Sequence, residues 1–519
     1  MGFKVSDLWR QPTLNPVNKK ARSVPIFNPI DRHGRVFFFS WLGFMLAFWA
    51  WYTFPPLLTV TIKKDLKLTP AQVANSNIVS LVATLAVRFA AGPLCDLLGS
   101  RRVFSLLLLV GSIPIGLAPL VKNATGLYVI RFFIGILGGS FVPCQVWCTG
   151  WFDKNVVGTA NALSGGWGNA GGGITYFIMP AVYDSLVHKW GHSPGEAWRI
   201  TFVVPLVCLI TCGLCLLFLC EDTPMGKWDD RHQNVQQNLA QHGISGEIVA
   251  IPGAITDRAH SAVAESDEEK ASVKEASSFT DKQIASSDDE AAISRTEAIE
   301  TAQGEIIAKP TMKESLSVIF SLHALFHVAT YACSFGGELA INSILSAYYL
   351  KNFPKLGQTT ASNYAAIFGF LNVITRPLGG VVGDLLYNRF GRSLWLKKIW
   401  IHVCGLLTGA LLIIIGKLDS HHLPTMIGLV ILMAVFHEAG NGANFALVPH
   451  VYPHANGILS GLTGAGGNLG GVIFAVIFRF MGSGSDYAKG LWIIGIIHIV
   501  LNVAVCWIPP IPKGQIGGR

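Results

Sequence analysis

The sequence predicts an all-α membrane protein whose twelve transmembrane helices form two pseudo-symmetric six-helix halves, and three observations lead to this fold class. Only 13% of the 519 residues are charged and 51% are hydrophobic, whereas soluble domains are roughly 25% charged. Twelve apolar runs are long enough to cross the ~30 Å hydrocarbon core of a bilayer. Six runs precede a polar central segment and six follow it, and the two sets share sequence matches.

The expected spans follow one another with short polar connections. The first six lie near residues 36–60, 73–95, 102–120, 126–151, 158–183 and 199–220. The last six lie near residues 318–350, 360–386, 396–416, 424–449, 456–480 and 488–510. They predict five regions: a cytoplasmic N-terminal tail (1–35), an N-terminal six-helix bundle (36–221), a disordered cytoplasmic loop (222–315), a C-terminal six-helix bundle (316–510) and a cytoplasmic C-terminal tail (511–519).

The central segment differs in charge from the rest of the chain. Residues 221–310 carry 18 Asp or Glu and 8 Lys or Arg, whereas the remainder carries 13 acidic and 31 basic residues. The segment has few aromatic residues and cannot bury enough apolar surface to offset the entropy of ordering, so we expect disorder. Ser266 and Ser287 each precede an acidic run that protein kinases favour; an unmodified solvated linker is the alternative.

The number and charge of the connections predict the topology. Twelve spans place both termini on one side, and the tails and loops of that side carry more Lys and Arg than the opposite loops. The positive-inside rule therefore places both termini in the cytoplasm. Because the basic residues accompany apolar runs, a lipid bilayer and an anionic cargo are the expected partners, and nucleic acid is not. The ten cysteines lie in apolar runs, and we interpret them as small hydrophobic residues without a metal.

Two internal matches relate the halves. Residues 88–98 match residues 376–386 at five of eleven positions, and residues 158–174 match residues 457–473 at eight of seventeen. Such a duplicated six-helix unit is typical of transporters whose binding site lies between the halves.

Arg88 and Arg376, in the middle of spans 2 and 8, give the clearest functional signal. A lone Arg at the bilayer centre costs at least about 2.5 kcal/mol, so each should face a cavity or a partner. As symmetry mates they would reach one central cavity from opposite halves, where two planar guanidinium groups suit one small anion. The alternative is that each binds a structural carboxylate or a helix carbonyl. Arg131, nearer the outer end of span 4, is expected to be structural.

Glycine-rich stretches surround Asn169 in span 5 and Asn468 in span 11. Each helical Gly costs about 1 kcal/mol relative to Ala, but small residues let helices approach closely. The two amides need a separate explanation. They either donate N–H groups to the same anion or form structural hydrogen bonds between helices.

Several motifs resemble known families. Gly92–Arg102 and Gly380–Arg392, in the loops after spans 2 and 8, resemble the G-x-x-x-D-x-x-G-R-R signature of the major facilitator superfamily, with an insertion displacing the G-R pair of the second copy. Arg131–Gly135 is similar to the R-x-x-x-G element of that superfamily. Gly165–Gly173 and Gly464–Gly471, together with one Arg in each of spans 2 and 8, resemble the nitrate/nitrite porter family, and the long central loop resembles that of its fungal members.

The resemblance implies a set of anion-binding residues in which two arginines and two asparagines bind the anion and aromatic rings enclose it. The positions that carry over are Arg88, Arg376, Asn169, Asn468, Tyr331, Phe335 and Phe141. In span 1 the choice between Phe48, Trp49 and Trp51 stays open.

Glu338 is a further charge inside a span. It lies two helical turns from Tyr331 and shares its helix face. A carboxylate near an anion site repels the anion unless it is protonated, so Glu338 is a candidate proton carrier. A permanent ion pair with Arg376 or Arg88 is the alternative, and Glu438 in span 10 is a second candidate.

Together these residues predict a plasma-membrane secondary transporter, not an enzyme, that imports nitrate and nitrite by alternating access. The sequence shows no nucleotide-binding loop or catalytic triad, and we expect no cofactor. Importing an anion into a negative cell opposes ~2.3 kcal/mol per 100 mV, which favours symport with two protons per anion. Nitrate/nitrite exchange is the mechanistic alternative. A porter of another small or organic anion and a nitrate sensor that signals through the central loop are the alternative functions.

Overall fold

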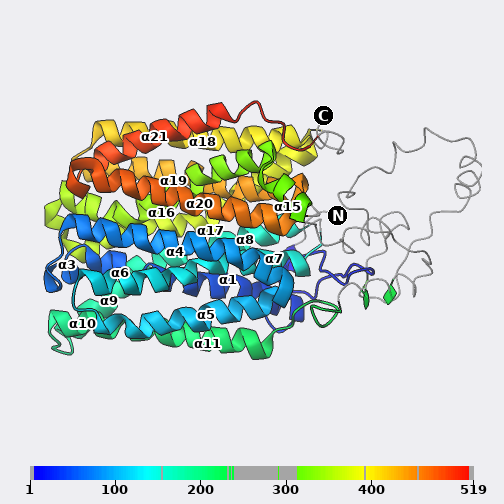
Figure 1. Cartoon of the computed structure of the whole chain (residues 1–519), viewed down its shortest axis with the longest axis horizontal. Coiled ribbons are helices and arrows are strands. Elements are labelled where there is room, and N and C mark those ends of the chain that lie inside the picture. The colour runs from blue at the N-terminus through cyan, green and yellow to red at the C-terminus, as the bar shows by residue number, and fades with distance from the viewer. Residues whose placement is uncertain are drawn as a thin grey trace, which may run out of the picture.

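The computed structural model describes residues 5–153, 156–230, 312–390, 393–452 and 455–512, with residues 233–234, 237–238 and 290 of the central segment. Long helices lie side by side in one bundle, and the described chain enters and leaves the bundle at the same end (Figure 1). The predicted kinase sites at Ser266 and Ser287 lie outside the described residues.

The N-terminal half starts at Asp31, whose carboxylate accepts hydrogen bonds from the first free N–H groups of helix α1. A capping box formed by Thr69 and Gln72 begins α4 in the same way. In chain order the helices are α1 (Arg32–Trp51), α2 (Phe54–Leu58), α3 (Thr61–Asp65), α4 (Pro70–Leu98), α5 (Ser100–Leu117), α6 (Ala124–Ile134), α7 (Phe141–Trp151), α8 (Val157–Asn169), α9 (Gly171–His188), α10 (Pro194–Thr201) and α11 (Val203–Leu219).

The C-terminal half repeats this arrangement with longer unbroken helices. They are α15 (Met312–Ile319), α16 (Leu322–Asn352), α17 (Gly357–Arg389), α18 (Leu394–Leu418), α19 (Leu423–Val451), α20 (Asn456–Phe480) and α21 (Tyr487–Ala504). Short 3-10 turns extend or join helices in both halves: η1 (Val5–Leu8), η2 (Ala118–Leu120), η3 (Gly135–Ser140), η4 (Pro354–Leu356) and η6 (Met481–Gly484).

In the described part of the chain, ten helical stretches are long and apolar enough to cross a membrane. The two remaining expected spans are also helical, as the α8–α9 pair and as α16, but their composition is more polar. Most residues of α16 are buried, so its polar groups face other helices instead of lipid, which could not hydrogen-bond them. The prediction of an all-α, twelve-span bundle is confirmed.

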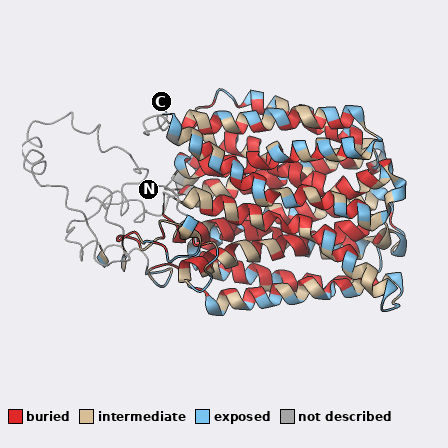
Figure 2. Ribbon diagram, turned by 180° about the vertical axis from the view of Figure 1, so that it is seen from behind, coloured by how far each residue is buried: buried red, intermediate tan, exposed pale blue. Residues whose placement is uncertain are grey.

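The two halves meet through equivalent helix pairs. Helix α4 packs on α20, and α17 packs on α8 and α9. In both contacts the second span of one half meets the fifth span of the other, as pseudo-twofold symmetry requires. Buried residues fill the middle of the bundle (Figure 2). Large apolar side chains such as Phe218 and Val503 are exposed on outer helices, where lipid would cover them.

Described residues of the central segment contact the N-terminal bundle and the N-terminal tail. The Asp222 carboxylate accepts a 2.6 Å hydrogen bond from Nε of Arg101, and Trp228 packs against Gly99. Glu290 forms a salt bridge with Lys19 of the N-terminal tail.

Candidate functional site

Arg88 projects from α4 into the centre of the bundle and is fully buried. Its Nε donates to the backbone carbonyl of Gly138 at 2.8 Å. Its Nη1 donates across the interface between the halves to the carbonyl of Gly464 at 3.1 Å. Nη2 is buried and has no hydrogen-bond partner among the described residues. Helix carbonyls therefore bind two nitrogens of this guanidinium, and the third remains available.

Arg376 reaches the same region from α17 and is 2% exposed. Its Nη2 donates to the hydroxyl of Tyr331 on α16 at 2.9 Å. Its Nη1 is buried without a hydrogen-bond partner in the described part of the chain. Neither Arg376 nor Arg88 forms a salt bridge with a described carboxylate.

Equivalent glycines of the two glycine-rich stretches make room for the arginines. A Cβ added to Gly165 would lie 3.3 Å from Nε of Arg376, and one added to Gly464 would lie 3.8 Å from Nη1 of Arg88. Each stretch therefore faces the arginine of the opposite half. A larger residue at either position would fill space beside a guanidinium.

A second equivalent pair of glycines makes room for aromatic rings. A Cβ on Gly168 would lie 1.9 Å from the ring of Phe44, and one on Gly467 would lie 2.8 Å from the rings of Tyr331 and Phe335. Such distances are far below van der Waals contact, so only glycine fits.

Phe141 and Phe335 stand beside both arginines. Their ring centroids are 6.2 Å apart and the planes differ by 22°. The guanidinium carbon of Arg88 lies 5.1 and 4.8 Å from these two centroids, and that of Arg376 lies 5.5 and 5.8 Å from them. These distances are within cation–π range. Tyr331 stacks on Phe335 at 5.1 Å, so the predicted aromatic residues gather around the two arginines.

The structure adds aromatic residues that the sequence did not single out. The ring centroid of Phe44 of α1 lies 5.5 Å from that of Phe141. The ring centroid of Phe445 of α19 lies 5.1 Å from that of Phe141. Phe48, one of the three span 1 candidates, lies 6.4 Å from Phe335. Gly168, the equivalent of Gly467, makes room for the ring of Phe44, but the match between the glycines does not identify that ring. No sequence signal identified Phe445.

The two motif asparagines are buried but differ in their bonds. Neither amide atom of Asn169 has a hydrogen-bond partner in the described chain. Nδ2 of Asn468 donates to the carbonyl of Gly464 at 3.1 Å, and its Oδ1 is unpaired among the described residues. A buried polar group without a partner costs about 1–3 kcal/mol. The Asn468 bond lies within α20, so neither asparagine forms, among the described residues, the hydrogen bond between helices that was the alternative.

Two buried glutamates flank the α17 segment that carries Arg376. Glu338 of α16 accepts hydrogen bonds from the amides of Asn372 at 2.9 Å and Asn441 at 2.6 Å. Glu438 of α19 accepts a 2.5 Å hydrogen bond from the hydroxyl of Thr375. Neither carboxylate forms a salt bridge with a described Arg or Lys. The permanent ion pair considered for Glu338 is not formed in this structure.

Arg131 binds within the N-terminal half, as expected of a structural residue. It is 4% exposed and donates from α6 to the side chains of Ser76 and Asn77 on α4. These bonds join two helices of one half.

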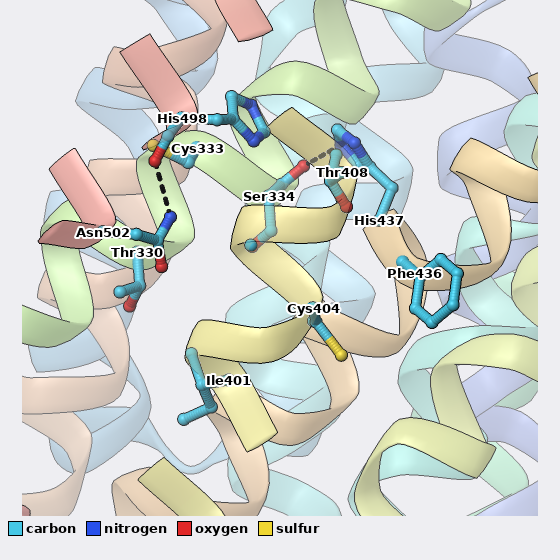
Figure 3. A pocket seen from close by; sticks show the side chains of 12 residues that line it. Thr330, Cys333, Ser334, Ile401, Cys404, Thr408, Phe436, His437, His498 and Asn502 are labelled. Carbon is cyan, nitrogen blue, oxygen red and sulfur yellow. Dashed lines mark hydrogen bonds between the residues drawn. The ribbon is translucent and has the colours of Figure 1, made fainter. Parts of the chain in front are cut away.

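A separate small pocket lies inside the C-terminal half (Figure 3). Its volume of about 10 Å³ is close to what one water molecule requires. His437 bonds the backbone carbonyl of Ser334 there, while Thr408 Oγ1 and both ring nitrogens of His498 have no hydrogen-bond partner among the described residues. Among those residues, no group of three or more His, Cys, Asp or Glu side chains is arranged to hold a metal ion.

Comparison with known proteins agrees with this architecture. The chain is 36% identical to Elsinochrome transporter 1 of Elsinoe fawcettii, over 99% of this chain and all of that protein. It is 30% identical to High affinity nitrate transporter 2.5 of Arabidopsis thaliana, over 94% of this chain and 82% of that protein. Among solved structures, the proton:xylose symporter XylE bound to 6-bromo-6-deoxy-D-glucose matches with a TM-score of 0.61 at 14% identity, covering 90% of this chain and 94% of that chain, a likeness of fold alone.

The family model of the Major Facilitator Superfamily matches residues 40–279 and 328–518, which is most of the chain. The helical bundle and its pseudo-symmetric interface agree with that match. The chain therefore belongs to the Major Facilitator Superfamily and is a multi-pass membrane protein that acts as a secondary transporter, not as an enzyme.

Proposed function

We propose that this transporter imports nitrate, and nitrite as well, across the plasma membrane, and that the anion binds between Arg88 and Arg376. One observation carries the proposal. Each guanidinium keeps one buried nitrogen without a described partner, and both guanidinium carbons lie within 6 Å of the same two phenylalanine rings. Two charged donors from opposite halves thus converge on one small site.

The chemistry of this site favours a small planar anion. A guanidinium presents its N–H groups in a plane that matches planar oxyanions, and the flat rings of Phe141 and Phe335 lie beside both guanidinium groups. The unpaired amide of Asn169 adds a further donor. Burial strengthens each of these interactions because water does not screen them. The 30% identity to a nitrate transporter over 94% of the chain supports the same cargo.

Alternating access would follow from rocking of the two halves about this site. The hydrogen bond from Arg88 to the carbonyl of Gly464 joins α4 to α20, and the hydroxyl of Tyr176 bonds the carbonyl of Asn342 across the same interface at 2.5 Å. Because these bonds cross between the halves, they have to change as the site opens to one side or the other. The charge of the connecting loops favours cytoplasmic termini.

Proton coupling is the mechanism that the buried carboxyl groups support. Glu338 and Glu438 are 5% and 0% exposed, and neither is neutralised by a described cation within salt-bridge distance. A buried negative charge is costly unless a proton neutralises it or hydrogen-bond donors stabilise it. Anion exchange needs no such group, and it remains the alternative mechanism.

A second candidate function comes from the relative with the higher identity. The 36% identity to Elsinochrome transporter 1 covers both chains almost completely, which favours transport of the cargo in that protein's name. The two functions differ in what must fit between Phe141 and Phe335, whose centroids are 6.2 Å apart. The two buried guanidinium groups beside these rings favour the small anion.

Labelled nitrate uptake in cells that lack their own nitrate porters tests the proposal. We expect saturable uptake that increases with an inward proton gradient and that unlabelled nitrite inhibits. Phosphate and carboxylates at the same concentration should not inhibit. Cells with normal surface expression but no nitrate uptake would overturn the proposal, and efflux of elsinochrome from the same cells would establish the second candidate.

A further inference from the structure

The two buried glutamates beside Arg376 differ in the hydrogen bonds that hold them. We propose that Glu438 takes up and releases the coupling proton, whereas Glu338 keeps a fixed negative charge. This inference rests on the proposed proton-coupled transport and assigns the proton to one carboxyl group. It reverses the order in which the sequence placed the two candidates.

The partners of Glu338 favour its ionised form. One oxygen accepts the N–H group of Asn372 and the other accepts the N–H group of Asn441. An amide N–H can only donate, and hydrogen bonds donated to a carboxylate stabilise its charged state. A proton on either oxygen would compete with the N–H group that this oxygen accepts. The two bonds therefore favour the ionised form of Glu338.

Glu438 has a partner that can either donate or accept. The hydroxyl oxygen of Thr375 lies 2.5 Å from Oε2 of Glu438 and 2.8 Å from the backbone carbonyl oxygen of Leu371. A hydroxyl has one hydrogen and two lone pairs, so it donates to one of these acceptors at a time. Oε1 of Glu438 has no partner in the described chain and leaves the carboxyl free of other donors.

The hydrogen bonds of Thr375 can therefore adapt to both protonation states. When Glu438 is ionised, Thr375 donates to Oε2. When a hydronium ion transfers its proton to Oε2 and leaves as water, Oε2–H donates to the Thr375 oxygen, and the hydroxyl hydrogen turns to the carbonyl of Leu371. The change needs only rotation about one C–O bond. The hydroxyl hydrogen of Thr375 has an acceptor in both states.

Charge compensation couples protonation of Glu438 to binding of the anion. Two arginines and two ionised glutamates balance at the empty site, and a bound anion adds one negative charge. A proton on Glu438 restores the balance, and an unbalanced buried charge is costly. The charged groups that act on Glu438 are Glu338 from α16 and Arg376 from α17. Among the described residues, α8, α18 and α20, the other helices packed on α19, add none.

The small pocket of Figure 3 reaches the same stretch of α19. His437 and Gly440, which line the pocket, lie on either side of Glu438 in the sequence. The volume of the pocket is close to what one water molecule requires, and the pocket lies next to the segment of α19 that carries Glu438.

Purified protein in proteoliposomes tests the assignment. We compare nitrate accumulation driven by a proton gradient with nitrate-for-nitrate exchange. Glu438→Gln should lower accumulation at least tenfold while exchange falls by less than threefold. Thr375→Val should lower accumulation several-fold, and Thr375→Ser should restore it because the hydroxyl returns. The exposed Glu196→Gln is the matched control and should behave as the wild type.

Infrared difference spectra give a readout that a structural role would not change. Adding nitrate to the wild type should produce the C=O band of a newly protonated carboxyl group, and Glu438→Gln should lack this band. A band that disappears in Glu338→Gln but persists in Glu438→Gln would overturn the assignment, as would accumulation in Glu438→Gln at the wild-type level. A wild type that exchanges nitrate without proton-driven accumulation would instead refute the proton coupling in the proposed function, and one that neither binds nor exchanges nitrate would refute the cargo.

Discussion

The arginines of the two halves occupy equivalent positions but are held differently. Arg88 of the N-terminal half donates to two backbone carbonyls, one of them across the interface. Arg376 of the C-terminal half donates to the hydroxyl of Tyr331, and two buried glutamates flank its helix. Backbone carbonyls cannot titrate, whereas carboxyl groups can. We infer that the N-terminal half gives the anion a fixed anchor and that the C-terminal half changes its protonation with the cargo.

Of the changes that test this comparison, replacing either arginine by lysine should lower nitrate uptake the most. Arg88→Lys and Arg376→Lys keep the charge but lose the planar set of donors. Losing one or two charge-assisted hydrogen bonds costs about 3 kcal/mol, or roughly 100-fold in nitrate uptake. Arg88→Lys should also lower thermal stability because the backbone bonds of Arg88 hold α4 to η3 and to α20. Labelled uptake and a melting curve measure both effects.

Arg10→Lys, in the exposed N-terminal tail, is the matched control for these two variants. A wild-type KM for nitrate in either Arg88→Lys or Arg376→Lys, at normal surface expression, would rule out a site built on two guanidinium groups.

Substitutions of Asn169 and Asn468 should have the next largest effect on nitrate transport, and the two positions should differ. Asp at position 169 or 468 places a negative charge beside the anion, so both Asp variants should transport less than the corresponding Ala variants. Asn169→Ala should cost about tenfold in KM, one lost hydrogen bond to a charged group. Asn468→Ala should cost less because its amide already donates to Gly464. Equal activity of Asp and Ala variants would mean that the amides do not touch the cargo.

The repeat predicted the positions of these residues but not their bonds. Sequence matches identify Arg88 with Arg376 and Asn169 with Asn468 because duplication preserves residue type and helix position. The partners come from other helices: Gly464 and Tyr331 are not equivalent, and nothing in the sequence periodicity shows which helix each arginine meets. The fold was predictable from composition, apolar runs and the internal repeat, whereas the asymmetry of the site depends on contacts between distant segments.

The hydrogen-bond partners of the glutamates could not be predicted from the sequence either. The sequence placed Glu338 on the face of Tyr331, and an ion pair with an arginine was a reasonable alternative. The structure instead gives Glu338 the amides of Asn372 and Asn441, which lie on two other helices. Hydropathy cannot predict such partners, because a single buried Asn changes the mean of a span very little.

Removing the hydroxyl of Tyr331 changes the C-terminal half less than replacing Arg376 does. Tyr331→Phe keeps the ring that stacks on Phe335 at 5.1 Å but removes the acceptor of Nη2 of Arg376. A hydrogen bond to a charged group contributes about 1.5 kcal/mol, so KM should rise roughly tenfold. Vmax should change less, because the ring and both guanidinium groups remain. A fall in Vmax with unchanged KM would show that the hydroxyl serves the conformational step.

Deleting residues 240–300 should have the smallest effect on transport. This stretch lies outside the described residues except for Glu290, whose salt bridge with Lys19 is lost. Partly exposed ion pairs typically contribute about 0–1 kcal/mol, so nitrate uptake should change less than twofold, and Glu290→Gln alone should match the deletion. The remaining residues still connect α11 to α15, and none of the residues around Arg88 and Arg376 is removed. Loss of uptake in a deletion variant that reaches the surface would show that the central segment takes part in translocation, and loss of nitrate signalling with uptake intact would favour the sensor hypothesis for this segment.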